Sequence, residues 1–230
     1  MTTRAVILQA AAELLAASPT GDISTRAVSE AAGVTQPVLY RHFGDKDGLL
    51  AAVVDHVWEA YLGPKRAAPA SADPLEDLRA GWDAHTAFAL ANPHAYRLLF
   101  GGALAARPDA AGEALALLTG ILERLAAAGR LRLAPQVAAR VVMAANSGIA
   151  LALILRGDAH PDPAVSTVMR EATLRGLLID APDAGETDAG AAVAAAATTL
   201  RAHLPHTDAF TPAEAGLLDE WLARIQPDPR

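Results

Sequence analysis

ISTRAVSEAAGVTQPVLYRHFGDKDGLL, residues 23–50, predicts two short helices joined by a tight turn and followed by the start of a third. Ser24 is the expected N-cap of the first helix. Gly33 should end that helix, because glycine adopts the left-handed conformation without a steric penalty. Thr35 and Asp45 are expected to cap the second and third helices by accepting bonds from free backbone amides. Two short helices around a glycine turn are typical of a helix-turn-helix.

The second short helix should present a polar face to solvent. Leu39 and Phe43 lie four residues apart, so we expect them to face inward. The outward side then carries an amide, an aromatic hydroxyl and a guanidinium, a surface that the major groove of DNA can accept. An ordinary helical hairpin with a solvated polar face would show the same pattern.

The longer string AGVTQPVLYRHFGDKDGLL, residues 32–50, favours the DNA-binding interpretation. It resembles the TetR family of transcriptional regulators, the family of the tetracycline repressors, and its QP-x-LY-x-H core carries the resemblance. The resemblance is strong over the N-terminal helices and extends to the rest of the chain only as a helical layout. It implies a homodimer that binds near-palindromic double-stranded operator DNA.

The resemblance also implies which side chains read bases. Gln36 and Pro37 would meet base edges, and Arg26 on the preceding helix would reach a guanine. These roles agree with the preferred pairing of glutamine with adenine and of arginine with guanine. Val38 and Arg41 depart from the matched pattern, so no operator sequence can be transferred.

Other side chains of the motif would hold backbone phosphates. The resemblance gives this role to Tyr40, His42 and Lys46, and Lys46 lies at the N-terminus of a helix, where phosphates are favoured. The full set of residues expected at the DNA is Ser24, Thr25, Arg26, Thr35, Gln36, Pro37, Val38, Tyr40, Arg41, His42 and Lys46.

Composition favours helices and excludes several kinds of chemistry. Hydrophobic residues make up 52% of the 230 residues but aromatic residues only 4%, which indicates helices with small side chains at their contacts. The absence of cysteine excludes disulfides, thiol catalysis and cysteine-ligated zinc. The N-terminus MTTRAVILQAA lacks the layout of a signal peptide, so we expect a cytoplasmic protein.

The net charge of −7 is unusual for a DNA-binding protein, which is normally basic. Acidic and basic side chains nearly balance even within residues 1–66. Affinity for DNA should therefore come from a few placed cations, doubled by a dimer, and not from a broad basic field.

The helix signals predict an all-α chain with three parts. Residues 1–63 should form a three-helix DNA-binding domain, 73–180 a helical bundle for ligand binding and dimerisation, and 181–230 a C-terminal two-helix extension. The helix that begins after Asp45 should stop at Gly63-Pro64, with residues 64–72 as a loop. Further helices are expected at about 4–17, 74–91, 93–100, 108–128, 135–156, 163–179, 189–204 and 212–225.

Two sequence patterns predict helix starts with a capping box, Asp73-Pro74-x-Glu76 and Thr211-Pro212-Ala213-Glu214. The segment 182–190 reads as a flexible linker. The last helix carries one apolar face that we expect to be buried, either on its own domain or in a dimer: Leu217, Leu218, Trp221, Leu222 and Ile225.

Residues 137–155 are apolar on almost every side. The segment carries Arg140 and Asn146, and its uncharged run is shorter than the ~20 residues of a membrane span, so we expect a buried helix of a soluble protein. Burial within one chain explains this apolarity as well as burial between two chains. The family layout implies that this helix and the next, 163–179, form the dimer interface.

A ligand site is expected in the bundle, where the scarce aromatic and polar side chains gather. Ordinary core packing around a hydrogen-bonded histidine would explain each of them singly. As a set they suggest a pocket for a mostly apolar or neutral small molecule: Trp82, His85, Phe88, Asn92, Tyr96, Phe100, Met143 and Asn146. Trp58 and Tyr61, at the far end of the helix that begins after Asp45, can contact this part of the chain.

The sequence thus predicts a DNA-binding transcriptional regulator, most simply a repressor that a small ligand releases from its operator. A TetR-like activator, a DNA binder controlled by a protein partner, and a small helical enzyme using His85 or Glu113 are the alternatives. No catalytic constellation, cofactor or metal site is expected. His203-x-x-His206 has a spacing that metal ligands use, but it straddles a helix end and fits a solvated loop better.

Overall fold

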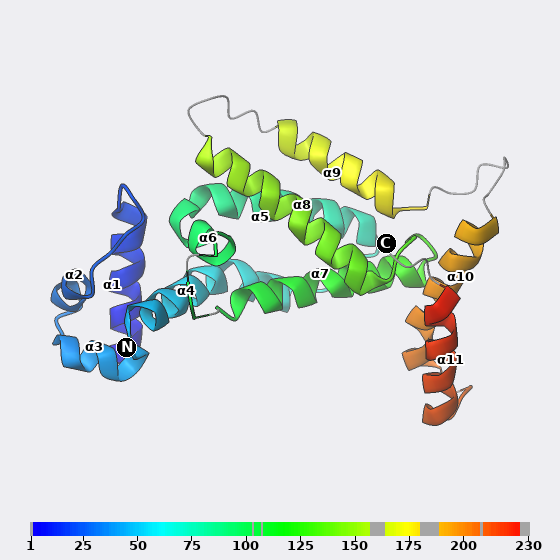
Figure 1. The fold of residues 1–230 in the computed structure, drawn as a ribbon, viewed down its shortest axis with the longest axis horizontal. Coiled ribbons are helices and arrows are strands. Elements are labelled where there is room, and N and C mark those ends of the chain that lie inside the picture. Colours follow the sequence, from blue (N-terminus) through cyan, green and yellow to red (C-terminus); the bar gives the residue numbers. More distant parts are fainter. Residues whose placement is uncertain are drawn as a thin grey trace. The chain divides into compact units, whose positions relative to one another are not determined.

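The computed structural model describes residues 2–102, 104–106, 108–156, 164–179, 189–207 and 209–225. Over these residues the chain is helical, and its only β-type pairing is one isolated bridge between Leu131 and Leu178 (Figure 1). The prediction of an all-α fold is confirmed. The predicted linker at 182–190, the helix end at Gly157 and the helix start at Asp162-Pro163 fall largely or wholly outside the described residues.

The helices follow the predicted order closely. Their bounds are α1 Thr3–Ala17, α2 Thr25–Ala31, α3 Gln36–Phe43, α4 Lys46–Ala67, α5 Pro74–Ala91, α6 Pro93–Phe100, α7 Ala110–Ala127, α8 Pro135–Leu155, α9 Ala164–Leu177, α10 Ala189–His203 and α11 Pro212–Ile225, with a short 3-10 turn at Leu204–His206. By internal contacts, residues 1–68, 85–114 and 150–161 form one compact unit, and residues 69–84, 115–149 and 162–230 form a second. The domain boundaries drawn from the sequence stay a prediction.

In the first unit, α1, α2 and α3 pack around the start of α4 (Figure 1). Of the two α3 positions predicted to face inward, Leu39 is fully buried in this core and Phe43 packs against it partly buried. Ala95 of α6 belongs to the same core. The helix α6 therefore packs directly on the helix-turn-helix region.

Backbone capping sets the geometry of the helix-turn-helix. Ser24 Oγ accepts from Ala27 N at 3.1 Å and Asp45 Oδ1 from Gly48 N at 2.7 Å, which confirms both predicted caps. Gly33 follows α2 with φ +64°, the conformation for which glycine was expected. The cap bond predicted for Thr35 is wrong: Thr35 occupies the N-cap position, but its side chain makes no bond to the helix.

The predicted end of α4 at Gly63-Pro64 is also wrong, because the helix continues to Ala67. Pro64 removes one backbone bond, but side chains on the last turns compensate. Lys65 Nζ lies over the Tyr61 ring at 4.5 Å, and Arg66 bonds both Glu59 and Glu113 at 2.8 and 2.6 Å. The predicted loop thus begins only after Ala67.

The two predicted capping boxes behave differently. At α11, Glu214 accepts from Thr211 N while Thr211 Oγ1 accepts from Glu214 N, which confirms the box. At α5, Asp73 Oδ1 caps the helix as expected, but the Asp73 amide donates to Ser71 Oγ and not to the glutamate. A serine two residues upstream therefore replaces the expected acceptor.

The helix α8 is less buried than its composition predicts. By length and composition it could cross a membrane, but a core helix of a soluble protein passes the same test, and only 33% of its apolar window is buried. Val141 is 40% exposed, so the expectation of burial on all sides within the chain is wrong.

The apolar face of α11 is likewise only partly covered. In the second unit, α10 and α11 pack on one another around a small core of Ala197, Leu204 and Leu222. Trp221 remains 52% exposed, and Leu217 and Ile225 are similarly open. A single helix such as α10 can cover only one side of α11. The expectation that the whole face is buried is therefore wrong within a single chain.

The Asp45 cap offers a direct test of what holds α4 in place. Asp45→Ala should lower the free energy of unfolding by about 1 kcal/mol, because the Gly48 amide loses its partner. Thr35→Ala is the matched control and should change stability by much less, since the Thr35 side chain makes no cap bond. Urea denaturation of both variants measures the difference; equal losses would contradict the assignment.

Candidate nucleic-acid interface and aromatic cluster

The start of α3 forms the exposed tip of the helix-turn-helix. Gln36 and Pro37 occupy its first turn and are exposed, as is Thr35 before them. Val38, next along the helix, is partly buried. Pro37 has no backbone N–H, and Val38 N already donates to Thr35 O at 3.0 Å, so the exposed Gln36 side chain presents the hydrogen-bond donor and acceptor of this turn to a groove.

Tyr40 of α3 forms a hydrogen bond with α2. Its hydroxyl lies 3.1 Å from Thr25 Oγ1, and 40% of the residue remains exposed. Arg41 and His42 follow in the last turn and are also exposed. Two hydroxyl groups from different helices therefore meet at the surface, an arrangement that suits a shared phosphate contact.

The two remaining cations of the motif are paired with acids. Arg26 Nε donates to Glu30 Oε1 at 2.9 Å, a bond that does not use the two Nη groups with which arginine contacts a guanine. Lys46 Nζ lies 2.7 Å from Asp22 Oδ1, and this pairing lowers the pKa of Asp22. Exposed pairs of this kind are weak, so phosphates can compete for both cations.

The predicted DNA-contacting residues all lie within the first unit, at the helix-turn-helix and the start of α4. Ser24 differs from the others because its hydroxyl already caps α2. The structure thus groups on neighbouring elements the donors that the resemblance selected.

A second feature of the first unit is a cluster of aromatic rings on α4, α5 and α6. Trp58 is fully buried at its centre, and five rings have centroids within 6 Å of it. We call this set the aromatic cluster: Trp58, Tyr61, His85, Phe88, Tyr96 and Phe100. Four of its members were predicted as ligand residues.

His85 and Tyr96 supply the polar part of the cluster. His85 Nε2 and Tyr96 Oη are 2.7 Å apart, and both residues are buried. Burial, followed by the charge of Lys65, lowers the pKa of His85 to about 4, so the imidazole is neutral at pH 7. Burial also raises the pKa of Tyr96. The interior of the cluster is therefore uncharged.

The remaining predicted ligand residues occupy other places. Asn92 stands at the N-cap position of α6, and its Nδ2 donates to Phe88 O at 3.1 Å. Trp82, Met143 and Asn146 belong to the second unit. There Trp82 Nε1 donates to Ser166 Oγ at 3.0 Å, and Asn146 Nδ2 donates to Trp82 O at 3.2 Å.

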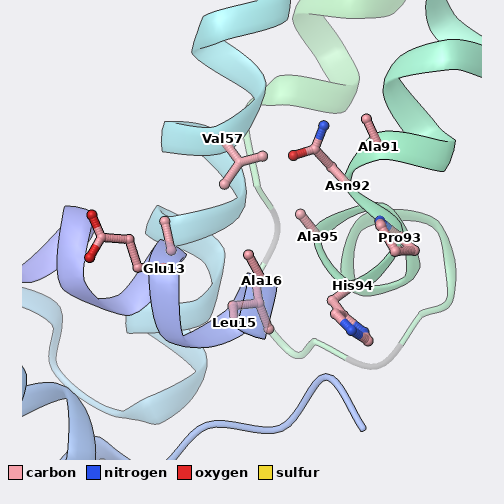
Figure 2. Close-up of a pocket in the computed structure, with 10 residues that line it drawn as sticks. Glu13, Leu15, Ala16, Val57, Ala91, Asn92, Pro93, His94 and Ala95 are labelled. Carbon is pink, nitrogen blue, oxygen red and sulfur yellow. The ribbon is translucent and has the colours of Figure 1, made fainter. Parts of the chain in front are cut away.

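A surface hollow of about 270 Å³ lies between α1, α4 and α6 in the first unit. Figure 2 shows Val57 and Asn92 facing each other across it, while the Glu13 carboxylate points away. Four of its ten lining residues are alanine, and its volume is just below the range usual for ligand sites. Asn92 is the one predicted ligand residue that lines it, so the hollow does not coincide with the aromatic cluster.

His203 and His206 lie at the end of α10 and in the 3-10 turn that follows it. His203 Nε2 lies 3.1 Å from Ala127 O. No group of three or more histidine, aspartate or glutamate side chains is placed to hold a metal ion among these residues.

Residues 7–53, which contain α1 to α3 and the start of α4, match the family model described as bacterial regulatory proteins, tetR family. The N-terminal domain belongs to the TetR family. The match covers the helix-turn-helix described above and confirms the resemblance drawn from the string around Gln36.

Among characterised proteins, part of the chain is similar to the HTH-type transcriptional activator FasR of Mycolicibacterium smegmatis. The two chains are 33% identical over 87 residues, which is 37% of this chain and 40% of FasR. The match spans less than half of either protein.

Solved structures share the fold over a longer stretch. FadR of Bacillus subtilis, solved in complex with stearoyl-CoA, superposes with a TM-score of 0.61 at 15% identity over 75% of this chain and 98% of FadR. NalD of Pseudomonas aeruginosa, the secondary repressor of the MexAB-OprM multidrug efflux pump, gives 0.55 at 21% identity over 78% and 98%. At such identities the likeness shows the fold.

The sequence selected four rings of the cluster, but it did not identify the ring at its centre. Trp58 and Tyr61 were expected only to contact the bundle, because they lie on the helix that begins in the DNA-binding domain. Their spacing of three residues on one helix face, followed by Lys65, was the available signal.

The buried histidine makes stability depend on pH in a predictable direction. His85 binds a proton in the unfolded chain below about pH 6.5, but the folded chain resists protonation until about pH 4. Stability from this group is therefore complete above pH 6.5 and is lost as the pH falls toward 4, by about 3 kcal/mol. His85→Gln should remove that part of the difference between unfolding free energies at pH 7 and pH 4.5. If the unfolding free energies of the variant and the wild type changed with pH by the same amount, the buried imidazole would not be neutral.

Proposed function

We propose that the protein is a cytoplasmic, homodimeric transcriptional repressor that a small, mostly apolar molecule releases from a near-palindromic operator. The observation that carries the proposal is the TetR-family helix-turn-helix with Gln36 and Pro37 exposed on the first turn of α3. A regulator, and not an enzyme, is the function that this domain supports.

The charge distribution supports sequence-specific binding over general affinity for DNA. Arg26 and Lys46 each lie beside a carboxylate, and the chain carries a net charge of −7. Random DNA must displace these acids without gaining base contacts, whereas an operator can offset the same loss with bonds to Gln36 and Arg26.

Exposed apolar side chains support a dimer. In the second unit, Val141 of α8 and Val165, Val168 and Met169 of α9 are each at least 40% exposed, which leaves apolar surface on two helices that the family layout assigns to dimerisation. A two-fold dimer would place two α3 helices on successive grooves about 34–36 Å apart, so that two short helices read one site.

The aromatic cluster supports control by a ligand. Trp58 and Tyr61 belong to α4, which begins directly after the helix-turn-helix. A molecule that rearranges the cluster would therefore act on the helix that holds the DNA-reading surface. By linkage, such an effector must bind the DNA-free conformation more tightly, and coupling of about 1–3 kcal/mol is typical.

Activation is the second candidate, because FasR, which shares 33% identity over 87 residues, is an activator. The two candidates use the same DNA contacts. They differ in whether transcription from a bound promoter rises or falls when the protein is supplied.

Selection of duplexes from a random pool tests the proposal and separates base from phosphate contacts. Wild type should select a near-palindromic site. Gln36→Ala should cost about 1–3 kcal/mol on that site and relax one position per half-site. Lys46→Ala should weaken binding to every sequence. It should also reduce the slope of log affinity against log salt concentration by the amount that about one phosphate contact per half-site contributes.

Three outcomes would each contradict a part of the proposal. Failure to enrich any sequence would exclude a sequence-specific regulator. An asymmetric selected site would exclude the two-fold dimer, and equal losses on selected and random DNA would remove Gln36 as a base reader.

A further inference from the structure

The ring at the centre of the aromatic cluster has an unsatisfied donor. Trp58 is 0% exposed, and its Nε1 has no hydrogen-bond partner. A buried N–H without a partner has lost its bond to water and gained nothing in return. Such groups are rare in folded proteins, and a ligand that brings an acceptor is one way to satisfy them.

Trp82 provides a comparison within the same chain. It is 2% exposed, so it is buried nearly as well, but its Nε1 donates to Ser166 Oγ at 3.0 Å. The chain therefore satisfies one buried indole with a protein acceptor and leaves the other without one. The difference lies at the cluster and is not a general property of its tryptophans.

The surroundings of Trp58 restrict what can approach its donor. Five rings surround it, and the polar groups of two of them, the neutral His85 and Tyr96, are bonded to each other at 2.7 Å. An anion placed here would lose its hydration and face the negative faces of the rings. Lys65 lies over the Tyr61 ring at 4.5 Å, but burial lowers its pKa and so disfavours the charged form that would attract an anion. An uncharged acceptor, such as a carbonyl oxygen, meets the donor without that penalty.

The less buried rings of the cluster are Tyr61, Phe88 and Phe100, and Phe88 stacks on Tyr61 with centroids 4.8 Å apart. A flat apolar molecule that replaces one of these ring contacts would keep the stacking and reach the indole edge. The site therefore favours an aromatic or similarly flat body.

We propose that the aromatic cluster binds an uncharged, flat apolar molecule carrying a carbonyl or comparable acceptor, and that Trp58 Nε1 donates a hydrogen bond to that acceptor. This inference rests on the proposed function, because it names the chemical class of the effector. It makes Trp58, on the helix that begins at the DNA-reading surface, the residue that distinguishes effector from plain hydrocarbon.

Three probes of similar size and one ring test the inference on the full-length protein without DNA. Acetophenone carries a neutral acceptor, ethylbenzene carries none, and benzoate carries an anionic one. Isothermal titration should give saturable binding of acetophenone, about tenfold weaker binding of ethylbenzene, and no binding of benzoate.

Variants then locate the donor. Trp58→Phe should reduce the affinity for acetophenone about tenfold, to that for ethylbenzene, while ethylbenzene itself changes less than about threefold. Benzothienylalanine at position 58 keeps the size of the indole and removes only its N–H, so it should act in the same way and covers the case in which the phenylalanine variant folds poorly. Trp221→Phe is the control, because Trp221 is 52% exposed and is not among the predicted ligand residues, and it should leave all three affinities unchanged.

Several results would overturn the inference: no saturable binding of acetophenone, equal binding of acetophenone and ethylbenzene, preference for benzoate, or unchanged acetophenone affinity without the Trp58 N–H. Because no DNA is present, these failures are distinct from failure of operator selection, which would remove the proposed function itself.

Discussion

The helix α4 runs without a break from Lys46 to Ala67, and the arrangement of the first unit depends on this continuity. Its first turn is capped by Asp45 and carries Lys46 beside the helix-turn-helix. Its later turns carry Trp58 and Tyr61 in the aromatic cluster. The stretch that joins the two sites therefore ends before Pro64 and is unbroken helix, which transmits a displacement along its axis better than a loop does.

The acids around the helix-turn-helix have a consistent physical role. Asp22 and Glu30 lie beside Lys46 and Arg26 and reduce their attraction for phosphates in general. Under the proposed function, this lowers affinity that any DNA would share and spares the contacts proposed to depend on sequence. Its negative net charge is then compatible with DNA binding, provided that the placed contacts are doubled by two-fold symmetry.

Local rules predicted most of the fold from the sequence. The buried Leu39, the positive φ of Gly33 and the capping box at Thr211 each depend on neighbours within a few residues, so periodicity and turn chemistry were sufficient. Where a prediction was wrong, the structure depends on a residue elsewhere in the chain, or on which of two nearby side chains accepts a backbone hydrogen bond. Pro64 was read as a stop because the ion pair of Arg66 with Glu113, 47 residues away, is not visible in a local pattern. The central place of Trp58 likewise arises only when α5 and α6 pack on α4.

The claim that the aromatic cluster and the DNA-reading surface act through one helix is tested most directly by linkage. The measurement is the affinity of the selected operator for wild-type protein with and without saturating acetophenone, together with the acetophenone affinity of free and operator-bound protein. The probe should weaken operator binding 5- to 150-fold, and the operator should weaken probe binding by the same factor. Identical operator affinity in both conditions, with acetophenone bound, would contradict the coupling.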